Sequence, residues 1–325
     1  MIKTGLLDPA RTLPLVIESC AEEGGKSPEV NYLIDWYKNN ESYVGEKLLE
    51  HGAILFRGFG VNSPAHFARL TRSVSRRLLE SMEENVPRTK LSAGVYTTTE
   101  YPPQYRLSMH SEFSYSHHWP AKLFFCCIKA AKEGGETPLA DNREVIKKLD
   151  GRIVEDVDRK QVKYLRNLHG GQGFGLSWQQ AFQTSERAAV EDYCRNSQIQ
   201  CEWKPNGTLK LSQTLPGIVM HPKTGDRVWF NQAPQFHPSD YPDEIYQSLI
   251  SVYKDEGDLP QNVCFGDGTA MDSGDLNTVR ETMFGASVIF PWREGDVVLL
   301  DNVLVSHGRM PFVGPRKTLV AMAAE

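Results

Sequence analysis

Short apolar runs separated by turn-forming residues make up much of the chain. Runs of strand length lie at residues 53–56, 124–128 and 297–300, and each is short enough to form one buried strand. Two further strands are predicted at 209–211 and 227–232, because Asn-Gly precedes the first and Thr-Gly-Asp precedes the second. Many short strands divided by turns are typical of a mainly β protein.

Helical spacing of apolar residues is concentrated near the N-terminus and in the middle of the chain. Residues 28–50 predict two short helices, with a break around Asn39 and Asn40. Ser63 followed by Pro64 predicts a helix start, since serine caps the first turn and proline fits its first position. Further helices are predicted from three segments: 142–146, 177–182 and 241–253.

Short strands with helical insertions predict an α+β fold that is mainly β, a double-stranded β-helix or jelly roll of two facing sheets. We expect one domain over residues 1–325, with an N-terminal helical segment of about 1–50 and a central lid or helical insertion of about 142–205. The glycine-rich stretch at 169–175 has no Gly-Lys-Ser/Thr sequence, so we interpret it as part of this insertion and not as a phosphate loop.

Charge and composition narrow the range of partners. The net charge is -5 and the pI is about 6.0, so there is no basic surface to indicate a nucleic-acid partner. No run approaches the ~20 apolar residues of a membrane span, and the N-terminal apolar run is too short for a signal peptide. Six cysteines without a Cys-x-x-Cys pair are interpreted as reduced thiols in a cytoplasmic protein.

Candidate metal chemistry lies in the segment 107–113, Leu-Ser-Met-His-Ser-Glu-Phe. In an extended chain His110 and Glu112 project from the same face, so both can reach one metal ion. His307, at the polar end of an apolar run, completes a set of two histidines and one carboxylate. That set is the facial triad of non-haem Fe(II) oxygenases. A solvated loop remains the alternative interpretation of an isolated His-x-Glu sequence.

Two neighbouring histidines are not expected to join this site. His117 and His118 are adjacent in the chain, and adjacent residues of an extended segment face opposite ways. We therefore interpret them as residues of the cavity mouth or of the surface.

Three ordered motifs carry a resemblance to a known family. They are His-x-Glu at 110–112, Gly-Gly-x-Thr-x-x-x-Asp at 134–141, and Asp-Asn-x-x-x-x-His-Gly-Arg-x-Pro-Phe-x-Gly-Pro-Arg at 301–316. Together they resemble the TauD/TfdA family of Fe(II)/2-oxoglutarate oxygenases, and most closely its branch near clavaminate synthase and the SyrP-type hydroxylases. The resemblance extends from residue 49 to residue 322.

The resemblance implies roles for individual residues. His110, Glu112 and His307 match the iron ligands. Arg316 matches the arginine that binds the distal carboxylate of the co-substrate 2-oxoglutarate, and Thr137 matches a threonine that hydrogen-bonds it. The spacing from His307 to Arg316 is shorter than in several members, which leaves Arg309 as the alternative partner of a carboxylate.

A carboxylate ligand also bears on the reaction, according to the same resemblance. Related halogenases have a small residue at the position of Glu112, so its presence favours oxygen transfer from O₂.

The resemblance places a substrate-contacting polar residue at the offset of Arg106, four residues before His110, and we expect Arg106 to contact a substrate carboxylate. Asn231, which follows an aromatic pair, is also expected to contact substrate. An ordinary salt bridge is the alternative for Arg106. The polar segment 82–105 is interpreted as a loop, and residues 97–103 within it are expected to lie over the site.

The resemblance implies an amino-acid or peptide-like substrate, either free or tethered to a peptidyl carrier protein, in natural-product biosynthesis. Three alternatives stay open: a catabolic dioxygenase for taurine, other sulfonates or small carboxylates; a non-catalytic jelly-roll binding protein; and a zinc hydrolase. The hydrolase lacks a helical His-Glu-x-x-His arrangement.

Overall fold

The computed structural model describes residues 2–20, 29–80, 88–98 and 101–324. Its largest sheet, here called the major sheet, has the strand order β1-β2-β3-β16-β7-β19-β5-β4. Only β2 and β3 pair in parallel in this sheet. The strands are β1 (Ile2–Leu6), β2 (Leu15–Ser19), β3 (Ala53–Arg57), β4 (Lys90–Ser92), β5 (Val95–Thr97), β7 (Lys122–Lys129), β16 (Val297–Asp301) and β19 (Lys317–Ala323).

A smaller sheet, here called the minor sheet, has the order β6-β17-β9. Its strands are β6 (Leu107–His110), β9 (Leu139–Asp141) and β17 (Val305–Arg309), and β8 (Glu133–Gly134) pairs nearby with β18 (Phe312–Val313). Apolar residues of both sheets share one hydrophobic core, among them Met109 and Val305 from the minor sheet and Phe125 from the major sheet. The two-layered jelly roll predicted from the sequence is confirmed.

Helices cover the other face of the major sheet. They are α1 (Val30–Asn39), α2 (Glu41–His51) and α3 (Pro64–Val74). Ser63 caps α3 as expected, since its side chain accepts a hydrogen bond from the His66 amide at 3.1 Å. Along β7, Cys126 packs on the helical side and Cys127 on the opposite side. A strand with both faces buried explains the unbroken apolar run at this point.

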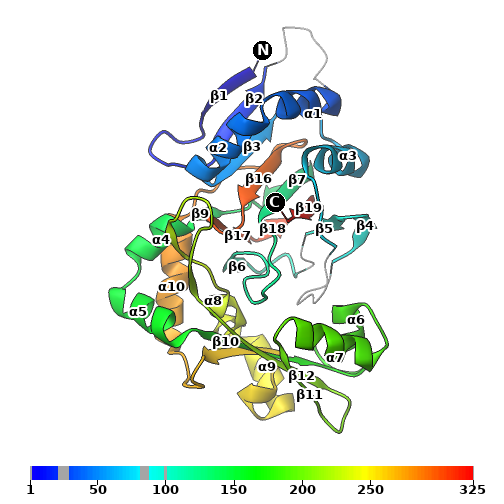
Figure 1. The fold of residues 1–325 in the computed structure, drawn as a ribbon, viewed down its shortest axis with the longest axis vertical. Coiled ribbons are helices and arrows are strands. Elements are labelled where there is room, and N and C mark those ends of the chain that lie inside the picture. Colours follow the sequence, from blue (N-terminus) through cyan, green and yellow to red (C-terminus); the bar gives the residue numbers. More distant parts are fainter. Residues whose placement is uncertain (1, 21–28, 81–87, 99–100, 325) are drawn as a thin grey trace.

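A long insertion between β9 and β16 forms the other end of the molecule (Figure 1). Its helices are α4 (Asn142–Lys148), α5 (Gly151–Lys160), α6 (Trp178–Phe182), α7 (Arg187–Asn196), α8 (Ala233–Phe236), η1 (Pro238–Asp240), α9 (Asp243–Tyr253), η2 (Glu256–Asp258) and α10 (Ser273–Ala286). Its strands are β10 (Val162–Leu168), β11 (Gln200–Trp203), β12 (Leu209–Leu215), β13 (Ile218–Met220), β14 (Arg227–Trp229) and β15 (Gln261–Phe265).

The structure differs from three expectations about these segments. The N-terminal segment expected to be helical over about 1–50 begins with β1 and β2, which extend the major sheet. The central insertion is not confined to about 142–205 and is not only helical, because a four-stranded sheet, β11-β12-β10-β15, runs through it. In the segment 82–105, β4 and β5 replace part of the expected loop.

The strands predicted at 209–211 and 227–232 are present as β12 and β14, whereas β10, β11, β13 and β15 were not predicted. Buried and partly exposed positions alternate in the first half of β10, so it contains no long apolar run. The glycine-rich stretch at 169–175 does lie in the insertion, between β10 and α6, and its residues 170–175 are exposed.

A buried ion pair joins β3 to the start of β16. The Arg57 guanidinium donates two hydrogen bonds to Asp296, at 2.9 and 2.7 Å, and the two side chains are only 10% and 1% exposed. Removing one partner of such a pair leaves an uncompensated buried charge.

We therefore predict that Asp296→Asn lowers the free energy of unfolding by about 3 kcal/mol or more, measured by urea denaturation. The control is Glu144→Gln, which removes an exposed pair with Lys147 and should change stability by less than about 1 kcal/mol. Equal effects of the two substitutions would contradict the stabilising role of the buried pair.

Candidate metal centre

Strand pairing brings the two histidines together. His307 on β17 is the Cα partner of His110 on β6, and the centres of the two imidazole rings lie 4.4 Å apart. Gly308 permits this close pairing, because a Cβ atom there would lie 2.7 Å from the Leu107 carbonyl oxygen. The register of the minor sheet therefore places both imidazoles on one face.

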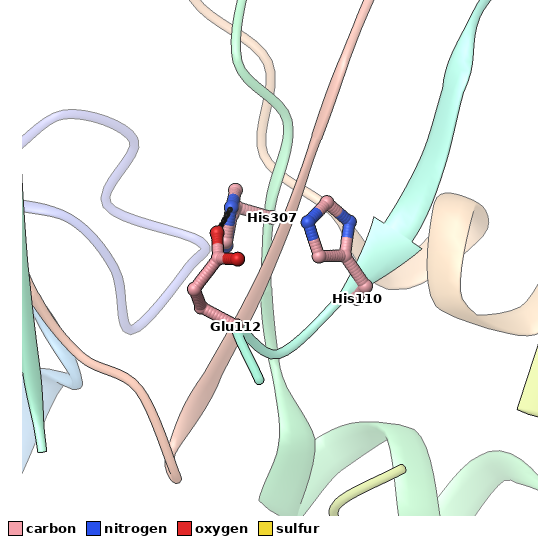
Figure 2. A group of neighbouring side chains, drawn as sticks. All are labelled: His110, Glu112 and His307. Carbon is pink, nitrogen blue, oxygen red and sulfur yellow. Dashed lines mark ion pairs between the residues drawn. The ribbon is translucent and has the colours of Figure 1, made fainter. Parts of the chain in front are cut away.

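Glu112 follows the end of β6 in a turn, and Asn302 holds its backbone. The Asn302 side chain accepts a hydrogen bond from the Glu112 amide at 2.7 Å and donates one to the Glu112 carbonyl at 2.8 Å. Asn302 is fully buried. Figure 2 shows the resulting arrangement, in which the side chains of His110, Glu112 and His307 point toward one another. One ligand atom from each residue lies within 4.8 Å of the others.

Both imidazoles are suited to bind a cation. Burial lowers the pKa of His110 and holds the pKa of His307 well below its usual range, so both rings are neutral at pH 7, as metal ligation requires. The His110 Nδ1–H donates to the Ser108 carbonyl at 2.9 Å, which leaves Nε2 with its lone pair for a metal ion. Two imidazole nitrogens and one carboxylate oxygen therefore fit iron(II).

Arg88 was not identified from the sequence, and it contacts the carboxylate ligand directly. Its guanidinium nitrogen Nη2 lies 3.0 and 2.9 Å from the two carboxylate oxygens of Glu112, and both side chains are buried. No motif includes Arg88, which lies 24 residues before Glu112. The sequence indicated it only through its position in the polar segment 82–105, part of which we expected to lie over the site.

Two cavities adjoin the three residues. The smaller, here called the His307 cavity, has about 390 Å³ of space between its lining atoms, and the larger, here called the Asp240 cavity, has about 710 Å³, in each case including space that is open to solvent. His110, Glu112 and Arg88 line both. The metal centre therefore has a small compartment on one side and a larger one on the other.

Arg316 lines the His307 cavity as a partly buried cation. Its Nε donates to the Gly135 carbonyl at 2.9 Å, and it forms no ion pair with any residue of the described part of the chain. Burial, and then the nearby Arg309, lowers the pKa of Arg316 to about 10, so the side chain stays charged at pH 7. A carboxylate in this cavity would supply the missing counter-charge.

Gly135 makes room for the Arg316 side chain. Its backbone has a φ of +75°, and a Cβ atom there would lie 2.9 Å from Arg316 Cδ. Thr137 lines the same cavity, and its hydroxyl accepts a hydrogen bond from Trp292 Nε1 at 3.1 Å. The Gly-Gly-x-Thr motif thus supplies both the space for the arginine and a hydroxyl beside it.

Arg309 also lines the His307 cavity, but its guanidinium is occupied. Its terminal nitrogens donate to the backbone carbonyls of Tyr101, Pro102 and Tyr105 at 2.7 to 2.8 Å. Arg309 therefore holds this loop, which leaves Arg316 as the better candidate for a carboxylate. Of the segment 97–103 expected over the site, Thr98 and Tyr101 line the cavities, and residues 99 and 100 lie outside the described residues.

The two residues expected to contact substrate have different positions. Arg106 lines the Asp240 cavity, with its guanidinium 4.5 Å from the centre of the Phe284 ring. Asn231 lines neither cavity, and the expectation for it is corrected. Its amide group donates to the Gly217 carbonyl and accepts from the Ala233 amide, so it holds its own loop.

His117 and His118 lie away from the ligand set, as expected. They line a separate cavity near Trp119, and the metal-binding group found among the described residues contains neither. The glycine-rich stretch at 169–175 lines neither cavity beside the metal centre. No helix in the part of the chain that the structure describes is long and apolar enough to cross a membrane.

Two histidines and one carboxylate at the mouth of a jelly roll define the class of non-haem iron(II) oxygenases. The family model described as taurine catabolism dioxygenase TauD, TfdA family, matches residues 18–322. The chain belongs to this family. It is a dioxygenase that uses iron(II), 2-oxoglutarate and O₂.

Two curated relatives align over most of the chain. The dapdiamide synthesis protein DdaC of Enterobacter agglomerans is 39% identical over 279 residues, which are 86% of this chain and 84% of that protein. A clavaminate synthase-like protein of Arabidopsis thaliana is 29% identical over 297 residues, which are 88% and 85% of the two chains. The resemblance found in the motifs therefore extends across the whole fold.

Solved structures share the fold at low sequence identity. One is PvcB of Pseudomonas aeruginosa, which is described as an Fe, alpha-ketoglutarate dependent oxygenase from an isonitrile synthetic pathway. Its TM-score is 0.54 at 15% identity, and the alignment covers 99% of this chain and 91% of PvcB. AAD-2, solved with Mn(II) and N-oxalylglycine, has a TM-score of 0.53 at 10% identity, with coverages of 99% and 97%.

We predict that Asn302→Ala weakens metal binding by about 10- to 100-fold, because groups that orient a ligand contribute this much to affinity. Calorimetric titration with Mn(II) measures the change. The matched control is Asn196→Ala on the exposed face of α7, which should bind Mn(II) as the wild type does. Unchanged affinity in Asn302→Ala would show that Glu112 is held by other contacts.

We also predict that Arg316→Met weakens 2-oxoglutarate binding by at least ~30-fold, since loss of one partner of a buried charge pair costs about 2 kcal/mol or more. Calorimetry on the Zn(II)-loaded protein reports the affinity without turnover. Arg293→Met, at a surface arginine whose side chain is 66% exposed, is the control. A larger loss in Arg309→Met than in Arg316→Met would reverse the assignment of the two arginines.

Proposed function

We propose that this dioxygenase hydroxylates an amino-acid or peptide-like substrate in the biosynthesis of a natural product. The observation that carries the proposal is the lining of the Asp240 cavity, which includes Gln232, Gln235 and Gln261 and does not include Arg316. The Gln232 side chain donates to the Gln235 side chain and the Gln261 side chain to the Gln235 backbone carbonyl, so the three residues form one amide network. Amide groups both donate and accept, so they suit the N–H and C=O groups of such a substrate. The name of the relative DdaC, a dapdiamide synthesis protein, supports the same assignment.

The two cavities have different roles in the proposed reaction, since one binds the co-substrate and the other binds the substrate. We propose that Arg316 and Thr137 orient 2-oxoglutarate in the His307 cavity, while His110, Glu112 and His307 hold iron(II) and leave three positions open. When bound, iron(II) supplies the activation of O₂ that turns 2-oxoglutarate into succinate and CO₂ and inserts the second oxygen atom into a substrate C–H bond.

Aromatic walls keep the reacting carbon away from water. Phe113 and Tyr115 are buried and line the Asp240 cavity next to Glu112. Excluding water favours reaction with the bound substrate over side reactions. Retention of Glu112 favours oxygen transfer over halogenation, whereas desaturation and epoxidation would begin from the same bound state.

The alternatives have less support. A small carboxylate without an amino group offers no partner for the Asp240 carboxylate, which lines the larger cavity beside Arg106. Taurine carries an ammonium group as well as a sulfonate, so the substrate screen below distinguishes it from an amino-acid substrate. A non-catalytic binding protein would have no reason to keep all three metal ligands together with Arg316. A tethered substrate remains part of the proposal, with a peptidyl carrier protein as partner. We place the reaction in the cytoplasm, since all six cysteines are free thiols.

The test is a substrate screen with two readouts, succinate formation and a mass gain of one oxygen atom. The panel holds free amino acids, their carrier-bound thioesters, and taurine. We expect an amino-acid compound to stimulate succinate formation and to gain oxygen, and His307→Ala to abolish both, along with the visible band of the anaerobic Fe(II)–2-oxoglutarate complex. His117→Ala, at an exposed histidine, is the control. Oxidation of taurine alone would refute the proposed substrate class.

A further inference from the structure

Asp240 presents an incompletely paired carboxylate to the larger cavity. It ends η1 and lines the Asp240 cavity, with a side chain that is 22% exposed. One oxygen, Oδ1, takes both of its side-chain contacts: the Ser108 hydroxyl donates to it at 2.6 Å, and Arg280 Nε lies 3.2 Å away. The other oxygen, Oδ2, accepts no hydrogen bond from any described residue.

Arg280 compensates this carboxylate only in part. Its Nε is closer to the Pro234 carbonyl, at 2.9 Å, than to Asp240, and Nη2 donates to the same carbonyl at 2.6 Å and to the Ser239 hydroxyl at 2.9 Å. Its remaining nitrogen, Nη1, donates to the Asn277 side chain. The arginine therefore mainly holds α8 and η1 in place, and its guanidinium does not form a two-pronged pair with Asp240.

Electrostatics agree with this geometry. Burial raises the pKa of Asp240, and the opposing effects of the Ser108 hydrogen bond, Arg280 and Arg106 are smaller. The negative charge of Asp240 is thus less stabilised than it would be in water, and a cation on the cavity side would stabilise it.

Ser108 links this carboxylate to the metal centre, because it forms hydrogen bonds with both Asp240 and His110. Ser108 and His110 are two residues apart on β6, so their side chains leave the same face of the strand, about 7 Å apart. Ser108 contacts both neighbours: its hydroxyl donates to Asp240, and its carbonyl accepts from His110 Nδ1. A group bound at Asp240 therefore lies on the substrate side of His110, within reach of a molecule that also approaches the metal.

We propose that Asp240, positioned by Ser108, binds a primary ammonium group of the substrate through its Oδ2 atom. The inference rests on the proposed function and narrows it, because it requires a substrate with a free amino group and excludes N-acylated ones. An ammonium group offers three donors and a full positive charge, which match an accepting oxygen with no other partner. Because the recognised group is the amine, the carboxyl end is free to be an amide or a thioester.

The test compares L-amino acid N-methylamides with their N-acetyl counterparts, which differ in the charged amine. Binding is measured by saturation-transfer NMR on the full-length protein loaded with Zn(II) and 2-oxoglutarate, so no turnover is needed. We expect at least one free amine to bind the wild type at least ~10-fold more tightly than its N-acetyl form. This preference corresponds to about 1.4 kcal/mol.

Asp240→Asn removes the charge but retains an oxygen that accepts from Ser108. We expect this variant to lose the preference for the free amine while binding Mn(II) and 2-oxoglutarate like the wild type and keeping its thermal stability. Glu244→Gln, at an exposed carboxylate of α9, is the matched control and should keep the preference. A merely structural Asp240 would instead lower stability and weaken both series equally.

The outcomes separate this inference from the proposed function. Equal binding of amines and N-acetyl forms, or a preference that survives in Asp240→Asn, would overturn the ammonium subsite and leave an amino-acid or peptide-like substrate standing. Binding of simple carboxylates and of sulfonates that lack an amino group, with neither series bound, would overturn both.

Discussion

Antiparallel pairing of β6 with β17 is the constraint on which the metal centre depends. It sets His110 opposite His307, and a slip of one residue in this register would turn one imidazole to the opposite face. The third ligand lies beyond the end of the strand, so it needs separate support, and Asn302 provides it through the Glu112 backbone. Backbone geometry and one buried amide together bring the three donors within reach of one ion.

Two charged side chains near this centre have no full counter-charge from the protein, so a bound small molecule could supply one. Arg316 is a partly buried cation without a carboxylate partner in the described chain, and Asp240 is a carboxylate with one oxygen that accepts no hydrogen bond from the described residues. In contrast, Glu112 is paired with Arg88. Incompletely compensated buried charges are unfavourable in isolation, and they are typical of sites where a ligand supplies the opposite charge. The His307 cavity thus contains a cation without a carboxylate partner, and the Asp240 cavity contains a carboxylate oxygen without a partner together with Arg106.

Contacts between distant segments determine the positions of the residues that the sequence did not predict correctly. Asn231 was expected in the pocket because of its aromatic neighbours, but the direction of its amide depends on the Gly217 carbonyl, which comes from another turn. Arg88 and Asp240 were not identified at all, since each meets its partner across 24 or 132 residues. No local pattern marks such a contact. In the insertion β12 and β14 were predicted, whereas β10 was not, because its buried positions are interrupted by polar ones.

The sequence by itself determined the features that depend on near neighbours: the apolar runs that became β3, β7 and β16, the cap at Ser63, and the ordered motifs containing His110, Glu112 and His307. These follow from local conformational preference and from side-chain chemistry. The tertiary structure determined that the guanidinium of Arg309 is bonded to backbone carbonyls while that of Arg316 has no carboxylate partner in the described chain, and that Asp240 faces the larger cavity. Those outcomes depend on packing between segments far apart in the chain, where burial and geometry, not residue type, decide which polar groups remain unpaired.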